Sequence, residues 1–354
     1  MIAPSSPLIN RLGKYSVSND GVVSFFWTAG GIEFTTTSSS VYLDVESTFE
    51  ECNQEIWLTI EIDGSLIQRI NLPAGKSTIC AFRKAEAGIA RTVRVLRESQ
   101  LDTYAKLHAL RFHAIHSKDE GGLQLLTPPA HKLNIEFIGD SITSGEGLNG
   151  AVGEMSFISA FYGFKNNYAC LTADSLDAYM TVSSQSGWGI YCGYNNDINT
   201  TMPKIYFTSE FGGEKLIEDR PEKDVIVINL GTNDAFAFKA PGWVNPATSE
   251  IYKLRMDSDG TLLAEDLDKI ADTGIKFIND LRKINPNAKY IWTGGMIGSD
   301  IKPAVEKICQ ATNIEMLWGI DCQDDQDYGS REHPGAKTHK KMSELLVDKI
   351  KTML

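Results

Sequence analysis

The spacing of apolar residues changes once along this chain, at a proline-bearing stretch that reads LTPPAHK over residues 126–132. Before it, apolar residues recur at every second position, which is typical of strands with one buried face. After it, short continuous apolar runs alternate with segments of helical spacing. Because 354 residues are also long for a single core, the sequence predicts two domains, at residues 1–125 and 133–354, joined by a linker over 126–132.

The first part of the chain predicts an antiparallel β-sandwich of the jelly-roll type. Residues 56–62 carry isoleucine or leucine at every second position, and Asp63-Gly64 then supplies a hairpin turn. Similar alternation occurs at 41–45 and 93–95, and another such run begins at Leu107. Short alternating strands separated by turns are typical of sandwiches and jelly rolls.

The second part predicts an α/β fold with a five-stranded parallel sheet and helices on both of its faces. Apolar runs short enough for single buried strands alternate with segments of helical spacing. The expected strands cover 134–138, 179–184, 225–230, 290–293 and 314–318, and the expected helices cover 166–178, 262–283, 303–312 and the end of the chain from about Pro334. In such sheets, functional residues lie at the carboxyl ends of the strands.

Net charge and hydropathy argue against two classes of partner, nucleic acids and membranes. The formal net charge of −12 opposes binding to nucleic acid or to an anionic membrane, because both would be repelled. No apolar stretch approaches the roughly 18–20 residues that span a bilayer, and the N-terminus lacks the pattern of a secretory signal. We therefore expect no nucleic-acid or membrane partner. If Met1 is the natural start, we expect a cytoplasmic protein, although a secreted chain trimmed of its signal would look the same.

The metal-binding residue types lack the spacing of known sites. The six cysteines show no C-x-x-C pair and fit free, partly buried thiols better than a disulfide framework or a zinc site. The acidic stretch DCQDDQD (321–327) lacks the residue order of a calcium loop and is expected to be a solvated loop. We expect neither a metal nor another cofactor.

Four short stretches combine the residue types of a serine hydrolase with positions at strand ends. A hydrolase of this kind needs a nucleophile, a base, and donors aimed at the oxyanion. Loops at one edge of one sheet can supply all of these together. Three of the stretches follow expected strands and the fourth precedes the last helix: GDS (139–141), SSQSGWGIY (183–191), GTND (231–234) and SREHPGAKTH (330–339).

In their order and setting, these blocks resemble those of the SGNH, or GDSL-type, hydrolases: G-D-S, a glycine after the second strand, G-x-N-D, and a late histidine. With a β-sandwich before it, the whole chain is similar to carbohydrate esterase family 2, whose members remove acetyl groups from plant polysaccharides. The resemblance implies a flavodoxin-like three-layer α/β/α fold for residues 133–354. It also implies a serine carboxylic-ester hydrolase, an acetylxylan esterase that acts on acetylated xylan or xylo-oligosaccharides.

By this resemblance, Ser141 matches the nucleophile and His333 the base that takes and returns its proton. SGNH triads usually carry an aspartate three residues before the histidine, and here that position is Ser330. The departure favours a Ser–His dyad, as in family 2, with the imidazole oriented by a group such as a main-chain carbonyl. His339, within the expected last helix, is expected at the surface. A carboxylate that folds back to the base is the alternative, and the candidates are Asp325, Asp327 and Glu332.

The oxyanion hole follows from the same resemblance. The Asn233 side chain and the N–H groups of Ser141 and Gly187 would hold the oxyanion, with Gly189 as an alternative to Gly187. Two aspartates are expected to be structural acceptors that hold the serine and asparagine turns, and these are Asp140 and Asp234.

Aromatic residues near the strand ends could form a platform for sugar rings or belong to the core; they are Trp188, Tyr194 and Trp318. Two further functions stay open: a lipid or thioester hydrolase on the same scaffold, and a non-catalytic carbohydrate-binding protein. The sequence does not identify the sugar, the role of the sandwich or the oligomeric state, and a homo-oligomer is compatible with it.

Overall fold

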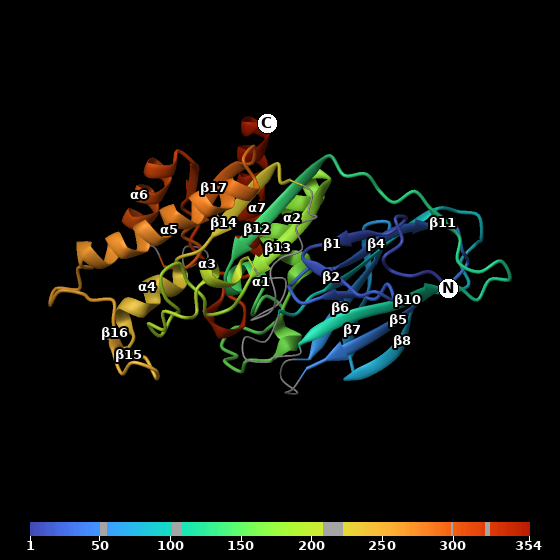
Figure 1. The fold of residues 1–354 in the computed structure, drawn as a ribbon, viewed down its shortest axis with the longest axis horizontal. Helices are drawn as coiled ribbons and strands as arrows, with labels where there is room; N and C mark the ends of the chain where they lie inside the picture. Colours follow the sequence, from blue (N-terminus) through green and yellow to red (C-terminus); the bar gives the residue numbers. More distant parts are fainter. Residues whose placement is uncertain (50–54, 101–107, 208–221, 299, 323–325) are drawn as a thin grey trace.

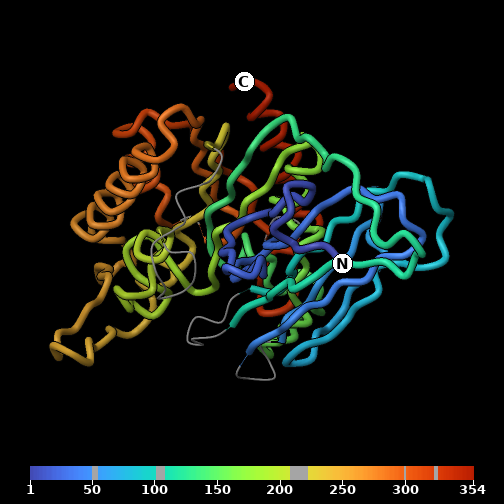
Figure 2. Tube along the Cα trace, turned by 45° about the vertical axis from the view of Figure 1, so that its right-hand side comes forward, coloured from blue at the N-terminus to red at the C-terminus, as the bar shows by residue number. Residues whose placement is uncertain are grey.

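The protein consists of two parts that lie side by side (Figure 1). The computed structural model describes residues 1–49, 55–100, 108–207, 222–298, 300–322 and 326–354. Antiparallel strands make up the N-terminal part, and a parallel sheet with helices makes up the rest. A second direction shows the same arrangement, with the orange helices on the left and the light-blue strands of the N-terminal part on the right (Figure 2).

Two antiparallel sheets form the N-terminal part. One runs in the order β1-β4-β9-β6-β7, with β11 paired to β4, and the other in the order β2-β3-β10-β5-β8. Their strands are β1 (Asn10–Leu12), β2 (Tyr15–Val17), β3 (Val23–Phe25), β4 (Gly31–Thr36), β5 (Val41–Thr48), β6 (Ile56–Ile62), β7 (Ser65–Leu72), β8 (Gly75–Phe82), β9 (Arg91–Arg97), β10 (Ala109–His116) and β11 (Leu125–Leu126).

Alternation builds the core of this part as the sequence predicts. Val41, Leu43 and Val45 of β5 are buried, whereas the residues between them are partly exposed. They share one apolar core with residues of both sheets. The prediction of antiparallel sheets is therefore confirmed. Leu107, where we expected a strand to begin, lies outside the described residues, and β10 begins at Ala109.

The second part contains a five-stranded parallel sheet in the order β13-β12-β14-β17-β18. Numbered along the chain, this is the order 2-1-3-4-5 of flavodoxin-like folds. The strands are β12 (Leu133–Gly139), β13 (Ala178–Ser184), β14 (Val225–Asn229), β17 (Lys289–Gly294) and β18 (Glu315–Trp318). A small hairpin of β15 (Trp243–Val244) and β16 (Ile251–Tyr252) projects from this part (Figure 1).

Helices cover both faces of the parallel sheet. Alternate residues of β14 point to opposite sides: Ile226 and Ile228 pack with α5 and α6, whereas Val225 and Val227 pack with α2 and α7. The predicted α/β/α arrangement is thus confirmed. The helices are α1 (Ser141–Ser144), α2 (Tyr168–Leu176), α3 (Met202–Ile205), α4 (Thr232–Lys239), α5 (Ala264–Ile284), α6 (Lys302–Thr312) and α7 (Ala336–Met353).

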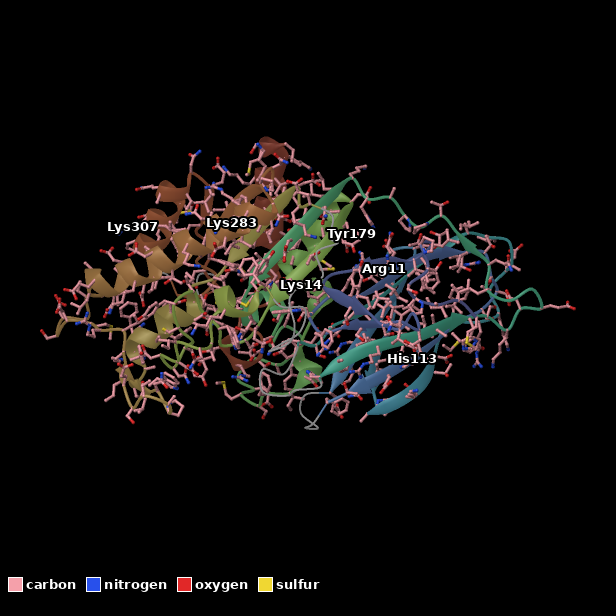
Figure 3. All side chains as sticks on the ribbon, viewed as in Figure 1. Arg11, Lys14, His113, Tyr179, Lys283 and Lys307 are labelled. Atoms are coloured by element: carbon pink, nitrogen blue, oxygen red, sulfur yellow. The ribbon has the colours of Figure 1, made fainter. Side chains whose placement is uncertain are left out.

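Polar and apolar contacts join the two parts. Lys14 is buried at their junction, where its ammonium donates to the Tyr206 carbonyl (2.5 Å) and lies 4.9 Å from the centre of the Trp27 ring. Figure 3 shows Lys14 between the sandwich and the parallel sheet, with Lys283 and Lys307 on the distant helices. Leu126, which we placed in the linker, pairs with Thr35 of β4. The sandwich is therefore packed against the α/β part.

Three further observations concern the described part of the chain. Five cysteines are free thiols, and the sixth, Cys52, lies outside the described residues. Within the described ranges, no three histidine, cysteine, aspartate or glutamate side chains are grouped so that they could hold a metal ion. None of the helices described has the length and apolarity needed to cross a bilayer.

Candidate active site

A cleft of about 600 Å³ opens at the carboxyl edge of the parallel sheet. In a 2-1-3-4-5 sheet, the strand order reverses between β12 and β14, and ligands bind just outside this point. Ser141 follows β12 directly at the start of α1, and Asn233 lies in the first turn of α4 after β14. Both residues line the cleft, together with Gly187 and His333. The four predicted blocks thus meet at one place.

The turn that presents Ser141 is held by Asp140. The Asp140 carboxylate accepts a hydrogen bond from the Ile142 N–H (3.0 Å) and so caps the four-residue helix α1. Asp140 is fully buried, and this burial raises its pKa to about 7, with the nearby charges of Asp234 and Glu146 acting in the same direction. The carboxylate is therefore a structural acceptor, as the sequence analysis expects.

Two residues that line the cleft have backbone N–H groups without a protein acceptor in the described part of the chain. Among the described residues, neither the Ser141 N–H nor the Gly187 N–H donates to another protein group. Buried donors of this kind are costly unless a ligand or water accepts from them. Donors without internal partners beside a nucleophile are what an oxyanion hole requires.

The side-chain amide of Asn233 is oriented by the backbone. Its Nδ2 donates to the Trp188 carbonyl (2.9 Å) and lies 3.5 Å from an Asp140 oxygen. An amide nitrogen carries two hydrogens, so the second one is only weakly engaged. It is available to an oxyanion in the cleft.

Asp234 is a structural acceptor, but for a different loop from the asparagine turn that we expected it to hold. Its carboxylate accepts hydrogen bonds from the N–H groups of Ile190 (2.7 Å), Tyr191 (2.8 Å) and Cys192 (3.2 Å). It therefore holds the loop after β13 against α4, rather than chiefly its own asparagine turn. Complete burial raises the Asp234 pKa to about 6, and these three hydrogen bonds oppose that rise.

The structure separates the two candidate glycines. Gly187 lines the cleft and has φ +79°, a conformation that side chains other than glycine rarely adopt. Gly189 does not line it, and a Cβ there would lie 2.0 Å from the Cys192 carbonyl oxygen and 2.4 Å from the Asp234 carboxylate. Gly187 is therefore the oxyanion candidate, and Gly189 permits close packing.

The imidazole of His333 is oriented by the main chain. Its Nδ1 lies 2.9 Å from the Arg331 carbonyl oxygen. A carbonyl only accepts, so Nδ1 carries the proton and Nε2 keeps its lone pair. Arg331 and Glu332 both adopt left-handed backbone conformations, with φ of 53° and 56°. This sparsely populated geometry places the carbonyl beside the ring it orients.

Among the described residues, none of the alternative carboxylates is paired with the His333 imidazole. Glu332 lines the cleft but is exposed. The Asp327 carboxylate accepts from the Thr338 N–H (2.6 Å) in the first turn of α7, and Asp325 lies outside the described residues. Ser330, at the usual aspartate position, is buried against Gly147 and Gly150.

The sequence analysis did not identify a buried glutamate that lies beside His333. Glu146 is 4% exposed, lines the cleft, and has an oxygen 4.0 Å from His333 Nε2. Its other oxygen lies 3.2 Å from the Arg331 guanidinium, which in turn stacks over Phe157. No motif marked this residue, because a single glutamate in a loop of small residues is also typical of a solvated turn.

Two residues from the sandwich, Ser99 and Gln100, line the cleft as well.

The three aromatic residues named in the sequence analysis lie at different places relative to the cleft. Tyr194 lines the cleft and is 57% exposed, so its ring is accessible to a ligand. Trp188 also borders the cleft, but it is 3% exposed and belongs to the core. Trp318 is not among the lining residues; its indole covers Gly294, whose Cβ would lie 2.4 Å from the ring. Trp318 ends the edge strand β18 and packs beside β17, so the lining of the cleft does not support its place in a sugar platform.

The prediction that His339 lies at the surface is also wrong. It is fully buried, its Nδ1 accepts from the Tyr168 N–H (3.2 Å), and its ring stacks on Tyr168. Burial lowers the pKa of His339 to about 3. Its position on α7 faces α2, so the histidine joins two helices of one layer.

The GDSL-like lipase/acylhydrolase family matches residues 135–346, which contain Ser141, Gly187, Asn233 and His333. The chain belongs to this family. Its hydrolase part therefore carries the catalytic domain for which the family is named. The matched residues form a carboxylic-ester hydrolase domain.

Similarity extends over the sandwich too. The structure of an acetyl xylan esterase, Est2A from the rumen bacterium Butyrivibrio proteoclasticus, is 32% identical, with a TM-score of 0.91 over 99% of this chain and 96% of that one. A family two carbohydrate esterase from Clostridium thermocellum, solved with cellohexaose, shares the fold at 22% identity, with a TM-score of 0.78 over 98% of both chains. The resemblance of this hydrolase to carbohydrate esterase family 2 is confirmed.

A curated relative is longer than this hydrolase. The cellulase/esterase CelE of Acetivibrio thermocellus is 24% identical over 99% of this chain, and the match spans 40% of CelE. The similarity is therefore to one portion of that protein.

Proposed function

We propose that this hydrolase removes O-acetyl groups from acetylated xylan or xylo-oligosaccharides through an acetyl-enzyme on Ser141. His333 Nε2 takes the proton of the Ser141 hydroxyl as its oxygen attacks the acetyl carbon. The N–H groups of Ser141 and Gly187, with the amide of Asn233, hold the oxyanion. Collapse breaks the ester bond, and Nε2 returns the proton to the leaving sugar oxygen. Water then repeats these steps on the acetyl-enzyme and releases acetate.

One observation supports the dyad above all others. The base and the nucleophile line one cleft, and the Nδ1 of the base donates to the Arg331 carbonyl. A neutral acceptor of this kind holds the tautomer in which Nε2 is basic, which is the orienting task that an aspartate performs in a triad. Among the described residues, no carboxylate takes that place beside Nδ1.

The substrate class is supported by the cleft and by the relatives. Tyr194, Phe157 and Phe236 border the cleft, and flat rings suit the faces of sugars. A chain with a net charge of −12 is compatible with a neutral glycan. Est2A is named an acetyl xylan esterase, and the Clostridium thermocellum enzyme is described in complex with cellohexaose.

Acetate release from acetylated xylo-oligosaccharides tests the proposal. Ser141→Ala should fold normally and lose turnover, and Asn233→Ala should lower kcat by roughly 10²–10³-fold, because one oxyanion donor is removed. Glu332→Gln removes the charge of an exposed carboxylate with little change of shape and is the control for a carboxylate-assisted base. It should keep kcat within about twofold, since a single exposed charge acts weakly. Unchanged acetate release by the Ser141 variant would refute the mechanism.

The preference for the length of the acyl chain in the ester distinguishes this function from a lipid or thioester hydrolase. A rate with p-nitrophenyl acetate well above that with a long-chain ester or an acyl thioester is expected. A preference for the long chain would favour a lipid or thioester hydrolase. Glycan binding without any esterase activity would favour the non-catalytic carbohydrate-binding protein.

A further inference from the structure

The sandwich reaches into the active-site cleft through the residues that follow β9. Gln100 is 6% exposed and lines the cleft. Its side-chain oxygen lies 3.0 Å from the Ser186 backbone nitrogen and 2.8 Å from the Ser186 hydroxyl. Because the backbone N–H is a donor only, the amide oxygen of Gln100, and not its nitrogen, faces Ser186.

Ser186 is held from the hydrolase side as well. Its hydroxyl also donates to the buried carboxylate of Glu146, and the Tyr162 hydroxyl lies 3.2 Å away. One hydroxyl carries one hydrogen, and a carboxylate is a stronger acceptor than an amide. The arrangement therefore assigns the Ser186 hydroxyl to Glu146 and the Ser186 N–H to Gln100.

A buried arginine fixes the backbone from which Gln100 extends. The Arg97 guanidinium donates to the carbonyls of Ser99 (2.8 Å) and Gln100 (2.7 Å) and is fully buried. Burial costs free energy for a guanidinium unless such acceptors surround it. The segment that carries Gln100 is thus anchored to a buried side chain of the sandwich.

Ser186 immediately precedes Gly187, which lines the cleft and whose N–H has no protein acceptor among the described residues. A glycine imposes little restriction on its own backbone, so the direction of that N–H must be set by its surroundings. The peptide plane between residues 186 and 187 is determined by the orientation of Ser186, and Ser186 is anchored at its N–H and at its hydroxyl. Loss of either anchor allows that plane to rotate.

We propose that Gln100, a residue of the sandwich, is a positioning residue of the hydrolase: it holds Ser186 and so aims the Gly187 N–H at the oxyanion. This inference rests on the proposed oxyanion role of Gly187. By this inference the sandwich contributes to the reaction itself. The acceptor that holds the Ser186 N–H is a side chain of the sandwich, and the α/β part alone does not supply it.

The test substitutes Gln100 in the full-length chain. Gln100→Met nearly conserves the shape of the side chain but removes the acceptor, and Gln100→Asn keeps the amide but withdraws it by one methylene. Both should lower kcat for p-nitrophenyl acetate by roughly 10–100-fold and leave KM within about twofold, because a misaimed donor affects the transition state more than the ground state. Asp174→Asn weakens another sandwich–hydrolase contact, the Arg94–Asp174 ion pair (2.8 Å), and should leave kcat unchanged.

A double-mutant cycle separates positioning from a general structural role. If Gln100 acts through the oxyanion hole, its loss should be less than additive with that of Asn233→Ala, whereas a purely structural role gives independent losses. Active sites counted from the p-nitrophenol burst normalise kcat, so partial unfolding does not hide the result. A kcat within twofold of the parent in both Gln100 variants, a rise in KM alone, or full additivity would overturn the inference. The proposed function is tested separately, by the Ser141 variant and by the preference for short acyl chains, and neither result depends on Gln100.

Discussion

At the scale of single residues, the loop that carries His333 has a serine where SGNH triads usually have an aspartate. The His333 imidazole is therefore oriented by a different group. The position of the usual aspartate holds Ser330, whose side chain points into a corner so tight that a Cβ on Gly150 would lie 2.2 Å from its hydroxyl. A carboxylate does not fit that corner without moving the loop. The Arg331 carbonyl orients His333 instead, and the left-handed backbone at 331 and 332 makes this contact.

Asp234 offers a test of how a buried carboxylate holds the oxyanion region. In Asp234→Ala, the N–H groups of Ile190, Tyr191 and Cys192 lose their shared acceptor, two of them on buried residues. Each buried donor left unsatisfied costs about 1–3 kcal/mol, so we expect a loss of roughly 3 kcal/mol in the free energy of unfolding, measured by urea denaturation. Asp259→Ala, which removes an exposed acceptor for the Thr261 N–H, is the matched control and should cost less. Equal effects of the two variants would contradict this account.

At the scale of elements, the site depends on where strands and helices end. Ser141 and Asn233 each follow a central strand, whereas His333 comes from a short turn (Ser330–Glu332) ahead of α7. The position of the His333 imidazole therefore depends on where α7 packs. His339, one turn into α7, binds the Tyr168 N–H at the start of α2 and thus links the two helices.

This link makes the protein sensitive to acid. The folded-state pKa of His339 is about 3, below the ordinary 6.5 of the unfolded chain. The unfolded chain then binds more protons, so stability is lost as the pH falls from about 6.5 toward 3. His339→Asn keeps an acceptor near the place of Nδ1 but does not titrate. Thermal unfolding between pH 7.5 and 4.5 should show a smaller decline for this variant, and an unchanged decline would count against the assignment.

At the scale of the whole molecule, the junction of the two parts carries both packing and charge. His131, in the segment between them, lies 2.7 Å from Glu33 of the sandwich and 3.2 Å from Asp177 of the hydrolase part. The hydrogen bond to Glu33 is the main cause that raises the His131 pKa, with Asp177 adding to it and partial burial opposing it. The charged imidazole thus bridges the two parts.

This bridge should weaken as the pH rises. A folded-state pKa above 6.5 gives a stabilising contribution that is complete below pH 6.5 and is lost as the pH passes the raised value. The melting temperature of the parent should therefore fall between pH 6 and pH 9 by more than that of His131→Gln. Lys132→Gln is the control, because Lys132 is mostly exposed and lies 3.5 Å from the same Asp177. Parallel curves for the parent and the His131 variant would refute the bridge.

The sequence by itself determined the antiparallel and parallel sheets and the four blocks of the site. Residue spacing encodes which face of a strand is buried, and a G-D-S or G-x-N-D block at a strand end is local information. It did not determine the burial of His339, the packing of Trp318 beside β17, or the approach of Glu146 to His333. Only the tertiary structure decided these, and it alone brought Gln100 from the sandwich to Ser186. Such contacts join positions far apart in the chain, and their geometry depends on how whole layers pack, which periodicity does not record.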